Sequence, residues 1–487
     1  MLGLGILGAG SAARSVPPFE VETWDIAGRV IDAQVTRADG QSWIVAVSVE
    51  GMPPDETRRL TIGRLGEAPR ILVLSARTLA FDIGDITPSP GPEILAITAD
   101  ALRVVTPDGR VLRTVALAPP LPFPPRTRQI SRTPVLRDWD GLGRTEALLP
   151  DARGFRVVPL ADPAAAHVLE LDVLHEAEGA GIGALEPGPW RAQLTWPTAA
   201  LADDDGDGIP EFHASDRFGL RVFRRGPGGL AARPEVRRRF PPFSFEEELR
   251  HVTNFLWARS PDLDGDGLAD LVVHRTVGTL SGARAHAALY RNRGDGADPT
   301  AEPDAVLVTE GGFGDLRVED LDADGSQELF ETSVKFGLFQ MIRIMTRGRA
   351  DVGLALYEVS AAGDGLATHE TWSATISVPF DTGKGRVGTL LPRTGGDWNG
   401  DGIRDLVYGE GDRLAVRLGE RADDGLRFSD AIAIDVRPAE GGRTADLDGD
   451  GLDELMLWNP IAPGAGLRIL RNRGQLPGSR PRLEPVD

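Results

Sequence analysis

The chain has no cysteine, which excludes disulfide bonds, lipid attachment through cysteine and thiolate metal sites. Lysine is nearly absent, since Lys335 and Lys384 are the only lysines among 53 basic residues. No uninterrupted run of 18 apolar residues occurs, so no transmembrane segment is expected. The 73 acidic residues give a formal net charge of −20, so nucleic acid is not an expected partner.

Motifs of several common catalytic classes are also missing. The sequence has no serine nucleophile elbow, no zinc-binding helix motif and no phosphate-binding loop. The seven histidines are scattered, although His251, His274 and His286 fall close together and form a candidate cluster. The sequence therefore leaves catalytic residues unassigned and favours a binding protein over an enzyme.

Short acidic loops of one repeated pattern are what the chain does contain. Five copies have an acid or amide at positions 1, 3 and 5, glycine at position 6 and an acid at position 9. Carboxylates this close repel one another by about 1 to 4 kcal/mol per close pair, so a cation is expected among them. Calcium suits such a loop because it takes six to eight oxygen ligands, whereas magnesium keeps its waters. We predict about five structural Ca²⁺ ions, with solvated acidic turns that hold no metal as the alternative.

The predicted ligands are the side chains at positions 1, 3, 5 and 9 and, at position 7, the backbone carbonyl. In order along the chain they are Asp203, Asp205, Asp207, Ile209, Glu211, Asp262, Asp264, Asp266, Leu268, Asp270, Asp320, Asp322, Asp324, Ser326, Glu328, Asp397, Asn399, Asp401, Ile403, Asp405, Asp446, Asp448, Asp450, Leu452 and Glu454.

Two weaker copies precede these five. The loop that starts at Asp138 has Leu142 at position 5, and the loop that starts at Asp85 keeps acids only at its two ends. Both are expected to bind calcium poorly or not at all. An EF-hand is excluded because it needs glutamate at position 12, and four of the five full copies lack it.

The loops recur about every 60 residues, and this period indicates a repeating supersecondary unit. Apolar runs of strand length, such as EILAI, DLVVH and ELMLW, follow them, and glycine-rich turn signals come later in several repeats. No long amphipathic helix is expected between them. The pattern predicts an all-β fold of antiparallel blades arranged as a β-propeller.

The acidic pattern followed at once by an apolar strand, as in DGDGLADLVV, NGDGIRDLVY and DGDGLDELML, resembles the FG-GAP or VCBS repeat of integrin-like propellers. The resemblance extends from about residue 20 to 475, although the motifs that name the family are poorly kept. It implies that each loop joins the first two strands of a blade.

Eight blades are predicted, with seven as the alternative. Residues 28–84 contain four strand-like runs but no acidic loop, which suits one further blade. Too few residues follow the last loop to complete a blade, so FEVETWDI near the N-terminus is expected to supply the missing strand. The predicted organisation is a signal-like or disordered segment at 1–17, a single propeller at 18–475 and a tail at 476–487.

The expected location is extracellular, at the cell surface or in the periplasm. Calcium sites of the extracellular type fill only where calcium is millimolar. The first residues, MLGLGILGAGSAARS, are similar to the later part of a secretory signal but lack its charged start, and a disordered tail is the alternative.

Three functions remain open, because propellers host many. The first is a protein-interaction or adhesion module, the second a carbohydrate-binding propeller, and the third a calcium-dependent polysaccharide lyase. The partner is therefore predicted to be a protein or a glycan.

Several residues are candidates for a ligand surface. Trp139 and Trp398 share a loop position with leucines and are expected in the core. The remaining candidates are the tryptophans outside that frame, an arginine cluster, and an elaborated segment in the long interval between Asp320 and Asp397. The residues of the first two groups are Trp190, Trp196, Trp257, Trp372, Arg233, Arg237, Arg238 and Arg239.

Overall fold

The computed structural model describes most of the chain. The described residues are 19–52, 55–88, 90–123, 130–179, 190–244, 255–278, 283–310, 312–335, 337–383 and 385–479. The predicted N-terminal segment 1–17, residues 480–487 of the predicted tail, and His251 lie outside them, so these predictions stay open.

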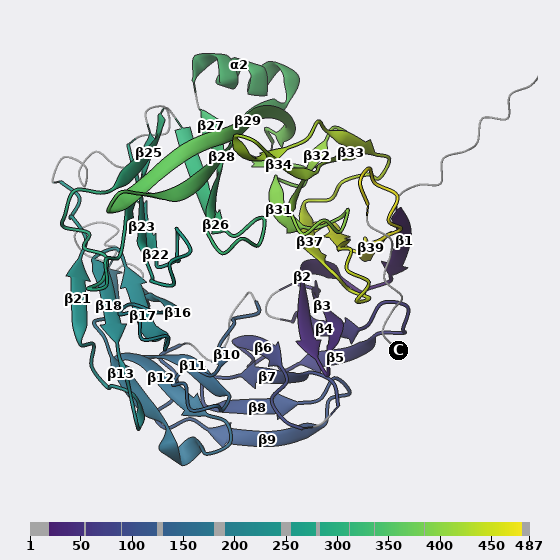
Figure 1. Ribbon diagram of the computed structural model, residues 1–487. Coiled ribbons are helices and arrows are strands. Elements are labelled where there is room, and N and C mark those ends of the chain that lie inside the picture. Colours follow the sequence, from purple (N-terminus) through teal and green to yellow (C-terminus); the bar gives the residue numbers. More distant parts are fainter. Residues whose placement is uncertain are drawn as a thin grey trace, which may run out of the picture.

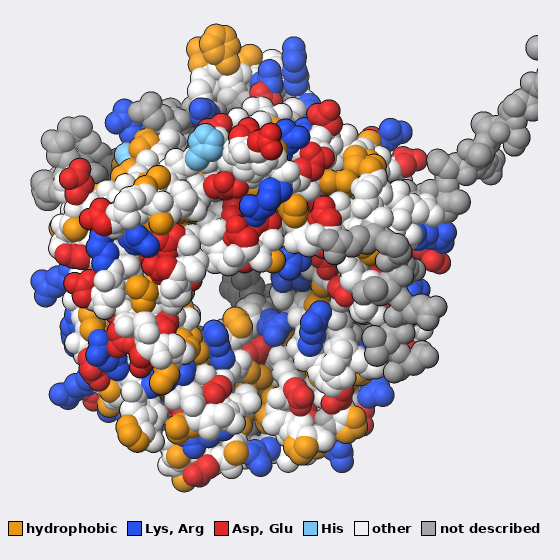
Figure 2. Space-filling model, in the orientation of Figure 1, with side chains coloured by type: hydrophobic (Ala, Val, Ile, Leu, Met, Phe, Trp, Pro, Cys, Tyr) orange, Lys and Arg blue, Asp and Glu red, His pale blue; other side chains and the backbone are white. Residues whose placement is uncertain are grey.

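Eight antiparallel sheets, each of at least four strands, stand around a common centre as the blades of a β-propeller (Figure 1). The first strand of each sheet lies nearest the centre and the fourth lies toward the outside. The space-filling view shows an opening at the middle of the ring (Figure 2). The predicted fold class and the count of eight blades are confirmed.

Blades 1 to 4 use the first half of the chain. Their strands are β2 (Arg29–Ala38), β3 (Gln41–Glu50), β4 (Thr57–Gly63) and β5 (Arg70–Leu74); β6 (Ala80–Gly84), β7 (Glu93–Ile97), β8 (Ala101–Val105) and β9 (Val111–Ala116); β10 (Leu136–Arg137), β11 (Glu146–Asp151), β12 (Gly154–Pro159) and β13 (His167–Glu170); and β16 (Thr198–Ala202), β17 (Glu211–Asp216), β18 (Gly219–Phe223) and β21 (Val236–Arg239).

Blades 5 to 8 use the second half and return to the N-terminus for the last strand. Their strands are β22 (Phe255–Arg259), β23 (Leu271–Val277), β24 (Arg284–Tyr290) and β25 (Ala305–Glu310); β26 (Gly312–Glu319), β27 (Glu328–Lys335), β28 (Arg349–Ala362), β29 (Gly365–Asp381) and β30 (Arg386–Val387); β31 (Arg393–Gly396), β32 (Asp405–Glu410), β33 (Arg413–Arg417) and β36 (Ile432–Ile434); and β37 (Gly441–Ala445), β38 (Glu454–Trp458), β39 (Leu467–Asn472) and β1 (Phe19–Trp24).

Smaller elements decorate the ring. They are three two-stranded sheets, one 3₁₀ helix and, within the described residues, one α-helix. These are β14 (Leu174–Gly179) with β15 (Trp190–Thr195), β19 (Arg225–Gly226) with β20 (Gly229–Leu230), β34 (Gly419–Ala422) with β35 (Gly425–Phe428), η1 (Pro163–Ala165) and α2 (Leu338–Arg347).

The apolar runs that follow the acidic loops form the second strand of each blade. In β7 and β38 every residue is buried, because neighbouring blades cover both faces of these strands. The outer strand β9, in contrast, has only one buried residue. Continuous apolar runs in the sequence therefore mark the second strand of a blade.

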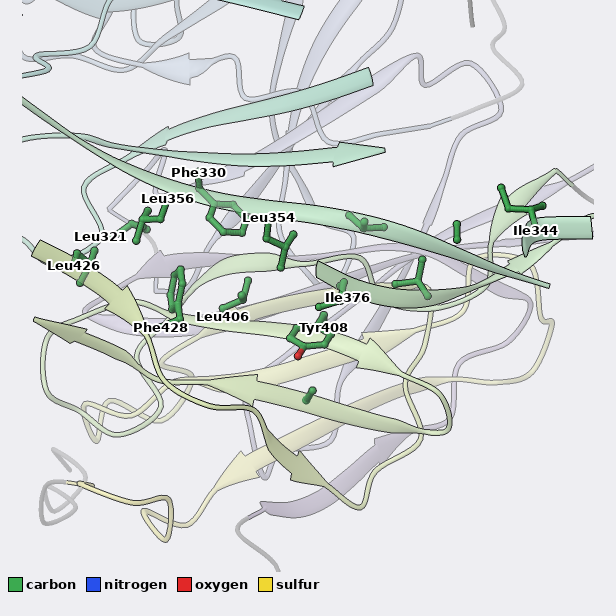
Figure 3. Packing of buried hydrophobic residues seen from close by; sticks show 14 residues of the cluster. Leu321, Phe330, Ile344, Leu354, Leu356, Ile376, Leu406, Tyr408, Leu426 and Phe428 are labelled. Carbon is green, nitrogen blue, oxygen red and sulfur yellow. The ribbon is translucent and has the colours of Figure 1, made fainter. Parts of the chain in front are cut away.

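The hydrophobic core is divided into eight clusters of buried residues, one between each pair of adjacent blades. The cluster between blades 6 and 7 is shown in Figure 3, where Phe330 and Leu354 of blade 6 face Tyr408 and Phe428 of blade 7. Burial of a large apolar side chain contributes roughly 1.5 to 3 kcal/mol. Each blade is therefore held by the two blades beside it.

The N-terminal strand β1 closes the ring as the sequence predicts. It pairs antiparallel with β39, from Phe19 opposite Asn472 to Trp24 opposite Leu467. Phe19 is buried between blades 7 and 8, and Trp24 between blades 8 and 1. Strand β1 therefore completes blade 8 and contributes to the hydrophobic clusters on both sides of that blade. We call such a cluster between two adjacent blades a seam.

Blade 1 has a tight hairpin where the later blades have acidic loops. Strands β2 and β3 are joined through Asp39 and Gly40, whose φ angles are +51° and +74°. Two consecutive positive φ angles are typical of a type I′ turn, which matches the twist of paired strands. The four strand-like runs of residues 28–84 form this blade, as predicted.

Blade 6 carries the largest elaboration and accounts for the long interval between Asp320 and Asp397. Helix α2 is inserted between β27 and β28, and strands β28 and β29 extend to 14 and 17 residues. Helix α2 has only ten residues, so the expectation that no long amphipathic helix lies between the repeats is not contradicted. No helix in the described part of the chain has the length and apolar character that crossing a bilayer requires.

Candidate metal centres

The five full acidic loops lie where blades 4 to 8 pass from their first strand to their second. The loop that begins at Asp203, for example, connects β16 to β17, and the loop that begins at Asp446 connects β37 to β38. This placement is the one that the sequence resemblance implied. Because equivalent connections lie at the same end of each blade, the loops form an arc on one face of the ring.

The carboxylate at position 1 holds the backbone of its own loop. Asp262 accepts hydrogen bonds from the backbone N–H of Gly265 and Gly267, both at 2.9 Å. Gly267 has a φ of +90°, a conformation that glycine adopts without strain. The position-5 carboxylate of Asp266 then accepts from the N–H of Leu268 at 2.9 Å. These bonds curl the loop around its acidic side chains.

The acid at position 9 links the loop to the second strand. In all five loops it accepts a hydrogen bond from the backbone N–H of position 2, at 2.7 to 2.9 Å. The weaker loops keep this contact, from Trp139 to Glu146 and from Ile86 to Glu93, at 2.8 Å. The position-9 acid is therefore part of the loop scaffold even where the other acids are missing.

Burial and nearby carboxylates make these position-9 acids hard to ionise. Burial raises the pKa of Asp270 and of Glu328 to about 7, and it raises the pKa of Glu454 to about 8. Neighbouring aspartates of the same loops add to the shift. A bound divalent cation would favour the ionised form and oppose these shifts.

Position 3 carries the observation that points most directly to a cation. Within the described residues, neither carboxylate oxygen of Asp264 or Asp322 accepts a hydrogen bond, and their side chains are 1% and 2% exposed. A buried carboxylate without hydrogen bonds is strongly destabilising unless a positive charge compensates it. The Oδ2 atoms of Asp264 and Asp322 are ion-paired with Arg291 and Arg421, which leaves the Oδ1 atom of each without a partner among the described residues. The donor set is all oxygen, so the residues fit a hard cation such as Ca²⁺.

Three carboxylates converge in each of five loops, with one oxygen from each lying within 4.8 Å of the others. Four of these loops belong to the predicted five, and the fifth is the weaker loop of blade 3. The loop of Asp397 is not among them because Asn399 stands at position 3. The five groups are Asp138, Asp140 and Glu146; Asp203, Asp205 and Glu211; Asp262, Asp264 and Asp270; Asp320, Asp322 and Glu328; and Asp446, Asp448 and Glu454.

The blade 3 loop contains a positive charge of its own. Arg144 Nη2 lies 2.8 Å from Asp140, and Arg144 Nε lies 3.1 Å from Glu146. This guanidinium neutralises the cluster from within the loop. The interpretation that this copy binds calcium poorly is consistent with this pairing.

Arginines also reach the other loops from neighbouring elements, and the sequence did not assign them to the sites. Arg291, which follows β24, lies 2.8 Å from Asp264, and Arg471 in β39 lies 3.4 Å from Asp448. Arg421 comes from blade 7 and pairs with Asp322 of blade 6. Two of these arginines could have been found from the sequence, because Arg291 and Arg471 occupy the same place in the repeated RNRG motif.

We predict that Arg291→Gln lowers the melting temperature in chelator and enlarges the rise produced by calcium. The arginine is a countercharge for Asp264 only while no metal ion is bound, and a partly buried pair of this kind contributes about 1 kcal/mol. Differential scanning fluorimetry with and without calcium measures both effects. An unchanged calcium shift would show that Arg291 does not compensate this loop.

Hydrogen bonds also connect the loops of blades 5 to 8 to the loop of the preceding blade. In each pair the backbone N–H at position 8 donates to a carbonyl at position 1 or 2 of the neighbour. The pairs are Ala269 to Asp203 (2.6 Å), Gln327 to Leu263 (3.1 Å), Arg404 to Leu321 (2.6 Å) and Asp453 to Asp397 (3.0 Å).

Two asparagines strengthen the same connection and were also missed by sequence reasoning. Asn292 donates its backbone N–H to Asp270 at 2.7 Å and its Nδ2 to the carbonyl of Asp204 in blade 4 at 2.9 Å. Asn472 bonds in the same way to Glu454 and to the carbonyl of Trp398 in blade 7. Order in one acidic loop is therefore transmitted to the next blade.

The tryptophan candidates have partners within the protein. Trp139 and Trp398 are 5% and 1% exposed, so their predicted place in the core is confirmed. Trp372 packs edge-on against Phe428 at 5.0 Å, and Trp257 stacks on His274 at 5.0 Å. The remaining candidate with described packing, Trp196, contacts Phe123 and donates to the carbonyl of Asp151, whereas the side chain of Trp190 lies outside the described part.

The arginine cluster and the two described histidines of the candidate cluster do not form a common site. Arg238 makes two 2.7 Å contacts with Asp204, and Arg233 pairs with Glu170 at 2.7 Å. His274 lies opposite Ala287 in the sheet, whereas His286 lies opposite Arg275, so the two histidines project from opposite faces. The sheet therefore separates His274 from His286.

The chain was compared with protein families, curated proteins and solved structures. No family model matches the chain, and no curated protein matches it. The crystal structure of the V. cholerae biofilm matrix protein Bap1 is similar over 96% of this chain and 92% of that chain, with 12% identity and a TM-score of 0.42. A chain of the TcdB2-TccC3-Cdc42 complex matches over 93% of this chain and 28% of that chain, with 11% identity and a TM-score of 0.15.

Proposed function

We propose that this protein is an extracellular β-propeller of the FG-GAP or VCBS type, stabilised by calcium in its acidic loops and acting as a protein-interaction or adhesion module. The convergence of three carboxylates in four of the five full loops supports this proposal, together with the buried Oδ1 atoms of Asp264 and Asp322, which have no partner among the described residues although Arg291 and Arg421 pair with the Oδ2 atoms. The ligands are those predicted from the sequence at positions 1, 3, 5, 7 and 9 of each full loop.

Calcium in this proposal stabilises the structure rather than taking part in a reaction. Position 9 joins each loop to the second strand of its blade, and position 8 joins four of the five loops to the neighbouring blade. An ion at the centre of the loop would therefore stabilise a blade and a seam together. Since the chain has no cysteine, calcium would take the place of disulfides as the cross-link suited to a calcium-rich compartment.

A cavity of about 1030 Å³ lies beside α2. It is lined by Glu331, Glu370 and Tyr357, and burial raises the pKa of Tyr357 to about 12. The Tyr357 hydroxyl therefore stays protonated at neutral pH. For the carbohydrate alternative, Trp257 and Trp372 lie against other rings of the protein rather than forming open platforms.

Native mass spectrometry of the full chain in millimolar calcium tests the metal assignment. Several calcium adducts are expected, and Asp264→Asn and Asp322→Asn are each expected to remove one. Asp435→Asn is the control, because this side chain is 93% exposed and lies outside the loops. A metal-free wild-type chain would overturn the calcium part of the proposal.

The adhesion role needs a separate measurement. The immobilised chain should retain a protein from the envelope of its own organism in calcium and release it in chelator. A positive glycan array with no protein partner would instead establish the carbohydrate alternative.

A further inference from the structure

Helix α2 presents its apolar side to solvent, which is the reverse of an ordinary surface helix. Leu338, Met341, Ile342 and Met345 follow the i, i+3, i+4, i+7 spacing that places side chains in one stripe. They are 74%, 41%, 48% and 77% exposed, and the neighbouring Phe339 is 87% exposed. We call these five residues the α2 apolar stripe.

The polar side of the helix faces the protein. Gln340 Nε2 donates to the carbonyl of Asp351 in β28 at 2.9 Å, and Arg343 pairs with the carboxylate of the same residue. Ile344 is the one buried residue of the helix. These contacts fix the orientation of α2, so the exposure of the stripe follows from how the helix is attached.

The chain segment that carries the stripe is basic, although the whole chain carries a charge of −20, and Glu331, Asp351 and Glu370 line the cavity beside the helix. Residues 335–350 contain Lys335, Arg343, Arg347 and Arg349 and no acid. Lys335 and Arg347, before and at the end of the helix, are exposed. Figure 1 places α2 at the outer rim of the ring, and Figure 2 shows apolar side chains projecting there with basic side chains beside them.

We propose that the α2 apolar stripe docks on the surface of an anionic phospholipid membrane. A short amphipathic element with aromatic and aliphatic side chains on one side and basic residues around them suits the boundary between headgroups and acyl chains. The exposed Lys335 and Arg347 complement the negative surface potential of such a membrane. This surface lies outside the acidic loops and adds membrane attachment to the proposed interaction role.

A second copy of the chain is a less suitable occupant. A helix of ten residues is about 15 Å long, and its stripe covers much less than the roughly 800 Å² per partner that a stable interface buries. Two copies related by symmetry would also bring Lys335 and Arg347 of one copy near those of the other, and like charges repel.

The test is co-sedimentation of the full chain with vesicles of phosphatidylcholine containing about one third phosphatidylglycerol. Measurements in chelator exclude bridging by calcium. Phe339→Ser with Met345→Ser is expected to weaken binding by about tenfold or more, since each substitution removes a large apolar side chain from the contact. Added salt should also weaken binding, because it screens the basic residues.

The control exchanges two equally exposed apolar residues elsewhere. Ile71 and Val73 on the outer strand β5 are 61% and 60% exposed, and Ile71→Ser with Val73→Ser should leave vesicle binding unchanged. Equal loss in both double variants, or no binding by the wild-type chain, would overturn the proposal. A dimer in light scattering that the α2 variant abolishes would overturn it too, and would assign the stripe to a second copy.

Discussion

Transfer from millimolar calcium to chelator is expected to lower the melting temperature by roughly 5 to 10 °C. A site at ten times its dissociation constant contributes about 1.4 kcal/mol, so five sites contribute about 7 kcal/mol. For a chain of 487 residues the entropy of unfolding converts this free energy into a shift of that size. Differential scanning calorimetry in the two buffers measures it directly.

Variants of one loop show whether the shift comes from the acidic loops. Asp264→Ala with Asp266→Ala should remove at least about one fifth of the shift, because one of five loops is lost and the loops on both sides are hydrogen-bonded to it. Asp435→Ala, outside the loops, should leave the full shift. A wild-type melting temperature that ignores calcium would contradict the structural role of the ions, and an unchanged shift in the double variant would place the ions elsewhere.

Replacement of Trp24 by alanine is expected to lower the free energy of unfolding by roughly 3 to 5 kcal/mol, the range for a large aromatic residue removed from a core. Trp24 is 4% exposed and packs with Met456 and Trp458 of blade 8 and with Ile44 of blade 1. The cost is large because Trp24 is the residue of β1 that fills the last seam of the ring. Urea unfolding of the purified variant measures the loss.

Val21 in the same strand provides the matched control. Its side chain is 49% exposed, so Val21→Ala should change stability by no more than about 0.5 kcal/mol. A chain that begins at residue 25 should lose more than Trp24→Ala, because it leaves the edge of β39 without a partner and favours aggregation. Equal stability of Trp24→Ala and Val21→Ala would show that β1 does not hold the ring closed.

Much of the fold could be predicted because the repeat shows which positions in successive loops are equivalent. Leu263, Leu321, Leu447 and Trp398 occupy the same loop position, and all four are buried. The apolar runs after the loops could be assigned as strands because both of their faces lie against neighbouring blades. Ring closure by Phe19–Trp24 could be predicted by counting strands, since the last loop is followed by too few residues.

The parts that could not be predicted depend on neighbours that only the ring brings together. Arg421 pairs with Asp322, although the two lie in different blades, and Asn292 bonds to the backbone of Asp204. The Arg421 contact has no local sequence signal, and the repeated RNRG turn that contains Asn292 does not show which blade its side chain reaches. Helix α2 was not predicted because it is only ten residues long, and the exposure of its apolar stripe could not be predicted because such a stripe would ordinarily be assigned to a core.

The hydrogen bonds between successive acidic loops have a consequence for how the protein responds to calcium. Ordering of the loop at Asp203 positions the loop at Asp262, and the same relation connects the loops at Asp262, Asp320, Asp397 and Asp446 in turn. Binding at one site therefore prepares the next, and the calcium titration should rise more steeply than independent sites allow. Blades 1 to 3 contain none of the five full loops, so under the proposed calcium binding we expect a fall in calcium to loosen blades 4 to 8 first.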